Sequence, residues 1–294
     1  MSTYSIKELG IISGIKPHTI RTWEQRYGIL KPLRSDTNIR YYDDEQFKKL
    51  LNVKELLDAG MKISHIGNLS QSQFMAELDR VGAEAYKNEK HFEIIISQII
   101  ISIATFDEAL FEKTFTKCVS KFGLTKSYLK VIYPTLTKIG LMWCKSDIMP
   151  AQEHFLSNLI KKKLFATIDS LPIPQDSDQT WILFLREQEE HEIGLLFAYY
   201  LLKFYQKRVV YLGANVPYDN LRNVAEQVKA THLYTFLMRN DHNDEMSDLI
   251  DKLNNDFKEA TICFSGKKDI IEKITPSNKR IFINDVETLI KLIE

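Results

Sequence analysis

Residues 178–294 alternate strand-like and helix-like segments five times. Each apolar run is short enough for a buried strand, and each following segment repeats apolar residues at helical spacing. Parallel strands need a crossover between them, so this alternation predicts a Rossmann-like, doubly wound parallel sheet. The predicted strands are Trp181–Leu185, Arg208–Leu212, His232–Leu237, Ala260–Phe264 and Arg280–Ile283, and the predicted helices are His191–Tyr205, Tyr218–Lys229, Asn243–Phe257, a short one near Asp269 and Val286–Glu294.

The turn after the first of these strands carries a Glu189-x-His191-x-x-Gly194 pattern and lacks the glycine-rich fingerprint of dinucleotide-binding domains. Ligands of such sheets bind at the carboxyl ends of the strands, where this turn lies. An imidazole can ligate a metal, a carboxylate two residues earlier can orient it, and glycine lets a flat ring approach the backbone. Against this, a lone histidine at a helix start is more often a plain surface residue.

Residues 71–172 show no clear strand alternation. Apolar residues recur there at helical spacing, as in Phe155, Leu159 and Ile160. The plain interpretation is an all-helical bundle. Its predicted helices are Phe74–Lys87, His91–Ile103, Phe106–Phe122, Lys126–Cys144 and Pro150–Ser170.

The first 70 residues predict a winged helix-turn-helix. Ser5 can cap a helix through Ser13, and Pro17 suits the first turn of a second helix that Gly28 closes. Two helices joined by a glycine turn within about 25 residues are typical of DNA-binding modules. The basic and aromatic stretch Lys31–Tyr42 then reads as a two-stranded wing, followed by helices at Asp44–Ala59 and Ile63–Leu69.

Charge supports this division into a multidomain α and α/β chain with domains at 1–70, 71–172 and 178–294. The whole chain is balanced, with 39 basic and 39 acidic residues, yet residues 1–42 carry a net charge of +4. A basic end on a neutral chain suggests a DNA-contacting module with an unrelated remainder. The three scattered cysteines, Cys118, Cys144 and Cys263, indicate neither a disulfide framework nor a zinc site. With no signal-peptide pattern and no long apolar run, we expect a cytoplasmic protein without a membrane span.

The run from Arg21 to Gly28, RTWEQRYG, followed by Lys31-Pro-x-Arg34 and Asn38-x-Arg40-Tyr41-Tyr42, closely resembles the winged-helix reader of the MerR family of bacterial regulators. The resemblance implies a homodimer on a near-palindromic double-stranded DNA operator. Trp23 on the second helix is expected to pack in the core. Early residues of that helix reach the major groove or its phosphates, and wing residues hold the flanking backbone. The DNA-contacting candidates are His18, Thr19, Arg21, Thr22, Arg34, Arg40 and Tyr41.

The spacing Trp143-x9-Glu153-His154, together with Glu189-x-His191-x-x-Gly194, resembles the cobalamin-binding module of MerR-type photoreceptor repressors, the CarH, CarA and LitR group. The resemblance implies that His191 is the lower axial cobalt ligand and that Glu189 is its hydrogen-bonding partner. Trp143 would cover the upper face, flanked by Glu153 and His154. A tail slot would use Thr235-x-Leu237, then Ser265-Gly266 where the family has two glycines, so that Ser265 adds a Cβ.

These features predict a transcriptional repressor, not an enzyme, that binds adenosylcobalamin, responds to light and forms a dimer or tetramer. The absence of cysteines between the reader and Cys118 argues against a mercury, copper or zinc sensor. One alternative is a MerR-type regulator that works without cobalamin and uses its C-terminal domain for oligomerisation or partner binding. Another is a cobalamin enzyme, which the fused DNA reader and the lack of a substrate barrel disfavour.

Overall fold

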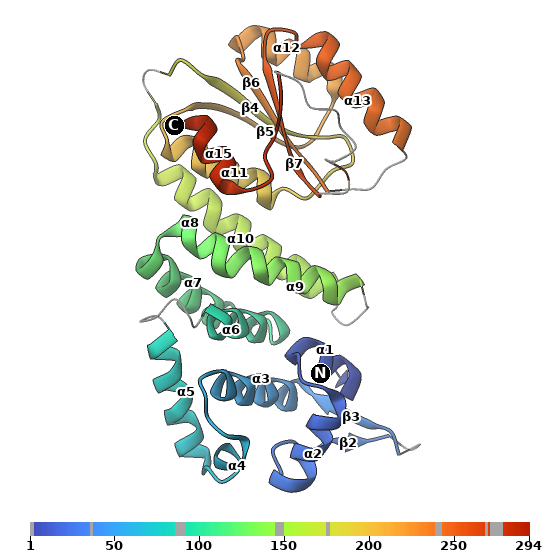
Figure 1. Ribbon diagram of the computed structural model, residues 1–294, viewed down its shortest axis with the longest axis vertical. Helices are drawn as coiled ribbons and strands as arrows, with labels where there is room; N and C mark the ends of the chain where they lie inside the picture. The colour runs from blue at the N-terminus through green and yellow to red at the C-terminus, as the bar shows by residue number, and fades with distance from the viewer. Residues whose placement is uncertain are drawn as a thin grey trace. The chain divides into compact units, whose positions relative to one another are not determined.

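The computed structural model describes residues 3–35, 38–85, 92–144, 150–174, 177–238, 243–267, 270 and 279–294, without the side chains of residues 83, 85, 141–144 and 243–247. Two compact units are described separately, Met1–Ser157 and Asn158–Glu294 (Figure 1). In the described residues, no helix has both the length and the apolar character that crossing a membrane requires.

The N-terminal winged helix-turn-helix of residues 1–70, called the reader below, begins with two capped helices, as the sequence predicts. Helix α1 (Ile6–Ser13) starts with a reciprocal capping box between Ser5 and Glu8. Helix α2 (Pro17–Tyr27) has Pro17 in its first turn and ends at Gly28 with φ 59°, a left-handed conformation that glycine adopts without strain. Leu9 and Ile20 are fully buried and join the two helices to the reader's core.

A small antiparallel sheet forms the wing. Strands β2 (Leu33–Arg34) and β3 (Arg40–Asp43) pair as predicted, with Arg34 opposite Arg40. The sequence pattern gave no sign of a third strand, β1 (Thr3–Tyr4), which pairs with the other edge of β3. Two residues are too short to show alternation, so only the tertiary pairing reveals this strand.

Helices α3 (Asp44–Asp58) and α4 (Ile63–Ile66) complete the reader, and Asp43 caps α3 by accepting a hydrogen bond from the Gln46 backbone. Glu55 is a buried carboxylate on α3, and its Oε1 accepts a hydrogen bond of 3.0 Å from Nε2 of Gln98. Gln98 belongs to helix α6 (Phe92–Ala104) of the following bundle. A polar contact inside an apolar interface therefore joins reader and bundle within the first unit.

The bundle is helical throughout its described residues, which confirms the predicted class. Besides α6 it contains α5 (Gln71–Ala85), α7 (Glu108–Phe122), α8 (Leu124–Ser127), a π-helical turn η2 (Tyr128–Ile132), α9 (Tyr133–Cys144) and α10 (Pro150–Ser170). Most of α6 is buried, including seven isoleucines, as expected of a central helix.

Three predicted helix starts in the bundle are wrong. Helix α5 starts at Gln71, three residues before the predicted Phe74. Helix α7 starts at Glu108, because Asp107 caps it and Phe106 lies outside with φ 52°. The single helix predicted from Lys126 starts at Leu124 and includes the π turn, in which one residue is inserted without breaking the apolar stripe.

The C-terminal sheet is parallel, in the order β5-β4-β6-β7-β8. The strands are β4 (Thr180–Arg186), β5 (Arg208–Val216), β6 (His232–Leu237), β7 (Thr261–Gly266) and β8 (Arg280–Phe282). The connecting helices are α11 (Ile193–Phe204), α12 (Tyr218–Val228), α13 (Asn243–Asp256) and α15 (Val286–Ile293). The doubly wound fold is confirmed, and the helix predicted near Asp269 lies outside the described residues.

Side chains alternate between the two faces of this sheet. Helices α12 and α13 cover one face of the sheet (Figure 1). Ile182, Leu233 and Phe264 belong to one apolar core with residues of these helices such as Leu221 and Leu253. Residues at the intervening positions face α11 and α15. This alternation decides which predicted site residues can share a pocket.

One predicted boundary in this unit changes the site. Helix α11 begins at Ile193, whereas the sequence predicts a start at His191. His191 therefore lies in the loop between β4 and α11, at the carboxyl end of the sheet. A loop residue can aim its ring at a ligand without the constraint of helical side-chain directions.

Candidate functional site

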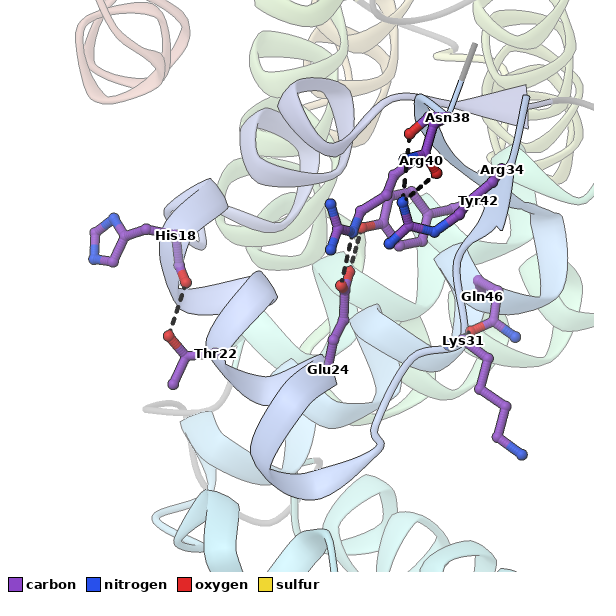
Figure 2. A network of polar contacts seen from close by, with 9 residues as sticks. All are labelled: His18, Thr22, Glu24, Lys31, Arg34, Asn38, Arg40, Tyr42 and Gln46. Carbon is purple, nitrogen blue, oxygen red and sulfur yellow. Dashed lines mark hydrogen bonds and ion pairs between the residues drawn. The ribbon is translucent and has the colours of Figure 1, made fainter. Parts of the chain in front are cut away.

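The recognition helix α2 presents the predicted basic and polar residues unequally. His18 and Arg21 are exposed, while Thr19 and Thr22 are half-buried. The Thr22 hydroxyl donates a hydrogen bond of 3.0 Å to the His18 carbonyl (Figure 2). Because this bond leaves Thr22 oriented along the helix, His18 and Arg21 are the freest of the four to contact DNA.

The predicted core position of Trp23 is corrected. Its side chain is half-buried, and Ile20 is the buried residue of α2. A tryptophan is large enough to cover a core with one face and keep the other in water, so partial exposure is common for it.

The side chains of Arg34 and Asn38 form a hydrogen bond within the wing. Asn38 has φ 64°, a left-handed conformation that asparagine tolerates better than most residues. The Arg34 Nη1 donates to Asn38 Oδ1 over 2.6 Å (Figure 2). The guanidinium remains exposed, so it can contact a phosphate while Asn38 fixes its direction.

Glu24 is a reader residue that the sequence analysis did not single out. Its carboxylate is 6% exposed, accepts a hydrogen bond from the Tyr42 hydroxyl and pairs with Nε of Arg40 at 3.4 Å. Burial and the adjacent Glu24 raise the pKa of Tyr42, so its hydroxyl stays a donor. Figure 2 shows both wing residues converging on this carboxylate from β3. Glu24 thus fixes the wing against α2.

The ion pair with Glu24 changes the role that the structure assigns to Arg40. From the sequence, Arg40 is expected to contact the DNA backbone, together with the half-buried Tyr41. The structure turns part of the Arg40 guanidinium toward Glu24 and leaves the side chain 30% exposed. In this conformation Arg40 is foremost a positioning residue, and its contact with DNA remains a prediction.

The Glu189–His191 pair is preformed in the second unit. Glu189 is fully buried, and its Oε1 lies 2.5 Å from Nδ1 of His191. The same carboxylate accepts hydrogen bonds from the His191 backbone at 3.2 Å and, through Oε2, from the Met238 backbone at 3.1 Å. Met238 follows β6, so Glu189 ties the histidine loop to the neighbouring strand end.

The imidazole itself is 66% exposed. When the ring is neutral, the buried carboxylate beside Nδ1 favours the tautomer with the proton on Nδ1, in which the lone pair is on Nε2. The arrangement therefore has the chemistry of a neutral imidazole ligand that is oriented before its metal arrives.

The sequence suggests that Gly194 lets a flat ligand approach the backbone, whereas the structure shows that Gly194 packs against Phe236. A Cβ at this position would lie 2.7–2.9 Å from ring atoms of Phe236 on β6. Such distances are far inside van der Waals contact, so an alanine would push the aromatic ring away. The glycine lets α11 approach Phe236, and its closeness to a flat ligand remains a prediction.

The predicted tail-slot residues do not all lie on one face of the sheet. Thr235 and Leu237 alternate with Phe236, and Gly266 is the register partner of Leu237. Ser265 is the register partner of Phe236, so its side chain lies on the opposite face. There it accepts a hydrogen bond from Tyr234 and donates one of 2.9 Å to the Ile283 carbonyl.

Two observations make the Thr235 face compatible with a polar ligand. Thr235 is fully buried, and its Oγ1 has no hydrogen-bond partner among the described residues. A buried hydroxyl without a partner is unfavourable, so a ligand that supplies one would be stabilised there. Gly266 has φ 141°, and a Cβ on it would clash with the Leu237 backbone at 1.9 Å, so glycine is required there.

The bundle residues of the predicted upper site lie on two helices. Trp143 is in the last turn of α9, and its side chain falls outside the described part. On α10, Nδ1 of His154 lies 3.3 Å from Oε2 of Glu153, whose Oε1 accepts a 2.5 Å hydrogen bond from Ser157. His154 is 74% exposed, so its ring is available to a ligand.

Comparison with known proteins finds a family match for the reader and another for the helical bundle. Residues 4–73 match the family model of the MerR HTH family regulatory protein, and residues 95–166 match that of the B12 binding domain. The HTH-type transcriptional repressor CarH of Myxococcus xanthus is 28% identical over 221 residues, which are 74% of this chain and 73% of CarH. The repressor CarA of the same organism is 26% identical over 228 residues, covering 77% of this chain and 74% of CarA.

A solved structure gives the same fold. The monomethylamine corrinoid protein of Methanosarcina barkeri superposes with a TM-score of 0.52 at 17% identity, over 72% of this chain and 97% of that one. At this identity the likeness concerns the fold alone. Taken with the family matches, the chain combines a MerR HTH domain with a B12-binding domain and is homologous to the transcriptional repressors CarH and CarA.

Proposed function

We propose that this protein is a DNA-binding transcriptional repressor that senses adenosylcobalamin, with His191 as the lower axial ligand of the cobalt. The observation that carries the proposal is the preformed pair of buried Glu189 and exposed His191 at the carboxyl end of a parallel sheet. Its support from outside the structure is the combination of reader and B12-binding domain in relatives that are named as repressors.

DNA is the ligand of the first unit in this proposal. His18, Arg21 and Arg34 are exposed on α2 and the wing, and Glu24 fixes these two elements relative to each other. A homodimer, or a tetramer built from dimers, would double the phosphate contacts on a near-palindromic operator. Operator affinity should then fall steeply as salt rises, because each phosphate contact releases counterions.

Adenosylcobalamin would supply a cobalt that accepts a nitrogen ligand and a cobalt–carbon bond that light can cleave. On the protein side, His191 provides the nitrogen and Glu189 holds its tautomer and direction. The unpaired hydroxyl of Thr235 would bond a polar group of the cofactor's tail. Trp143, Glu153 and His154 would cover the adenosyl side.

Coupling to DNA requires that the cofactor bind the DNA-competent assembly more tightly than the alternative assembly. Loss of the adenosyl group in light would then weaken operator binding. His154, with its exposed ring, is the candidate to approach the vacated upper position.

The decisive experiment uses the full chain and its His191→Ala variant. Each is mixed with adenosylcobalamin in the dark, passed through gel filtration and measured by visible absorption before and after green light. Affinity for an operator selected from a random duplex library is measured on the same samples. We expect corrinoid to co-elute with the wild type and its spectrum to change in the variant, while the operator affinity of the cofactor-free variant equals that of the cofactor-free wild type.

Each other outcome has a definite meaning. No corrinoid on the wild type would remove the cofactor and leave a MerR-type regulator whose C-terminal domain serves oligomerisation or partner binding. Bound corrinoid with unchanged operator affinity after illumination would remove the light response and keep the sensor. An unaltered spectrum in His191→Ala would remove His191 as the ligand.

A further inference from the structure

The loop that presents His191 is anchored by strand β5 as well as by Glu189. The Gln188 backbone donates a hydrogen bond of 2.7 Å to Oδ1 of Asn215, near the end of β5. On the other side of His191, Oε1 of Glu192 accepts a hydrogen bond of 2.7 Å from the Tyr211 hydroxyl. The loop is thus tied to β5 immediately before and immediately after the Glu189–His191 pair.

Tyr211 is held so that its hydroxyl has one direction. Its ring stacks on Tyr199 of α11 at 5.0 Å between centroids and meets Phe165 of α10 edge-on at 6.2 Å. Burial and then the Glu192 hydrogen bond raise the pKa of Tyr211 far above its ordinary value. The phenol is therefore a donor to Glu192 at neutral pH.

The irregular course of β5 makes room for this contact. The pairing with β4 shifts between Leu183 and Phe184, which are opposite Tyr211 and Gly213, so one extra residue bulges. Gly213 has φ 77°, and a Cβ on it would lie 3.2 Å from Oε1 of Glu192. Glycine at the bulge thus lets the Glu192 carboxylate approach the strand.

A cation from the preceding helix completes the surroundings of Glu192. Nζ of Lys161 on α10 lies 3.9 Å from Oε2 of Glu192, at the outer limit of an ion pair. The Glu192 side chain is 17% exposed. Its two oxygens therefore face two different elements, β5 and α10, while its backbone begins α11.

We propose that Tyr211, through Glu192, is a positioning residue that fixes the histidine loop for cobalt ligation. This inference rests on the proposed role of His191. Tyr211 donates its hydrogen bond to Glu192, the residue that directly follows His191, and is not itself a cobalt ligand in the proposal. Its hydroxyl restricts the loop so that little reorganisation is needed when Nε2 of His191 takes its ligand.

Tyr218 offers a matched control. Its hydroxyl also donates to a carboxylate, Oδ2 of Asp256 at 3.0 Å, and burial followed by Asp256 raises its pKa. It lies at the start of α12, bonds to α13, and lines a pocket with Arg186 and Glu187 at the carboxyl end of the sheet. Tyr211→Phe and Tyr218→Phe therefore remove the same kind of bond near the same end of the sheet, and only the first breaks a bond to the residue adjacent to His191.

The experiment measures adenosylcobalamin binding in the dark by equilibrium dialysis, the visible spectrum of the bound form, and the melting temperature of the cofactor-free protein. Tyr211→Phe should raise the dissociation constant about tenfold, in the range seen when partners of metal ligands are removed, and lower the His-ligated fraction in the spectrum. Both variants should lower the melting temperature of the cofactor-free protein by similar amounts. Tyr218→Phe should leave cofactor binding and the spectrum unchanged.

Glu192 variants test the same contact from its other end. Glu192→Gln keeps an oxygen that accepts the Tyr211 hydroxyl and should keep the wild-type spectrum, whereas Glu192→Ala should behave like Tyr211→Phe. Equal affinity and spectrum in Tyr211→Phe, Tyr218→Phe and wild type would overturn the positioning role. Failure of the wild type to bind, or a His191→Ala spectrum identical to it, would overturn the proposed function instead.

Discussion

Glu24 on the recognition helix and Arg40 on the wing form an ion pair at 3.4 Å, and the Glu24 carboxylate is almost completely buried. A buried carboxylate is stable only when its oxygens are satisfied, and here the Tyr42 hydroxyl supplies the second partner. The Glu24 carboxylate consequently joins helix α2 to strand β3 of the wing. This relationship assigns different tasks to basic residues that look alike in the sequence.

Replacement of Glu24 by alanine should weaken both the fold and DNA binding. The Tyr42 hydroxyl and the Arg40 guanidinium would lose a buried acceptor, which lowers the free energy of unfolding by about 1–3 kcal/mol. Operator affinity should fall as well, because the wing is no longer fixed against α2. Chemical denaturation and fluorescence anisotropy measure the two effects. Glu45→Ala, an exposed position on α3, is the control and should change either quantity little.

Arg21 and Arg40 should respond differently to replacement by alanine. Exposed Arg21 is expected to contact a phosphate, so its loss should reduce the slope of log affinity against log salt by about one and leave stability unchanged. Arg40→Ala should reduce stability and affinity together. A salt titration of operator binding with parallel melting curves separates the two cases, and an unchanged slope for Arg21→Ala would contradict its predicted contact.

Burial of the Glu55 carboxyl should make the stability of the first unit depend on pH. Burial raises the pKa of Glu55 from 4.5 to about 7, so the folded chain holds this proton more tightly than the unfolded chain. The stabilisation is complete below about pH 4.5 and is lost as the pH rises through about 7. Between these limits the free energy of unfolding should fall by on the order of 3 kcal/mol.

Glu55→Gln tests this origin of the pH dependence. The amide can still accept a hydrogen bond from Gln98 and has no proton to lose, so this part of the slope should vanish. Urea denaturation of the full chain at several pH values gives the measurement. Glu45→Gln removes an exposed carboxylate from the same helix and should keep the wild-type slope.

Glu189→Gln should impair cobalamin binding in the proposed function. The carboxylate accepts hydrogen bonds from His191 and from two backbone amides, whereas a glutamine presents one oxygen and one N–H₂ group. We expect the dissociation constant to rise about 10- to 100-fold. Equilibrium dialysis measures this change. The neighbouring exposed residue provides the control, and an equal loss in Glu190→Gln would mean that loop charge, not this bond, matters.

Ser265→Gly should not improve cobalamin binding. From the sequence, the Ser265 Cβ is expected in the tail slot, whereas the register places its side chain on the other face of the sheet from Thr235. The variant should instead lose the bonds to Tyr234 and Ile283 and be less stable by about 1–2 kcal/mol. A tighter complex would show that the tail passes on the Ser265 face. Thr235→Val, which removes the unpaired hydroxyl, should weaken binding while stability is kept.

Local rules explain how much of the fold was predictable. Ser5, Pro17 and Gly28 mark helix ends through capping and backbone preferences that involve only nearby residues. The strand and helix alternation likewise fixes a parallel sheet, because each segment must bury its own apolar face. Predictions were wrong where tertiary contacts decide, as at strand β1, the π turn and the start of α11.

The sequence by itself determined the order of reader, helical bundle and doubly wound sheet, and it identified His191 and Glu189 as a pair, since these two are near neighbours along the chain. Only the tertiary structure decided what lies around them. Glu24 meets Arg40, Glu192 meets Tyr211, and Ser265 turns from Thr235 because strand register and helix packing join residues distant in sequence. Such contacts depend on the packing of whole elements, which no local pattern records.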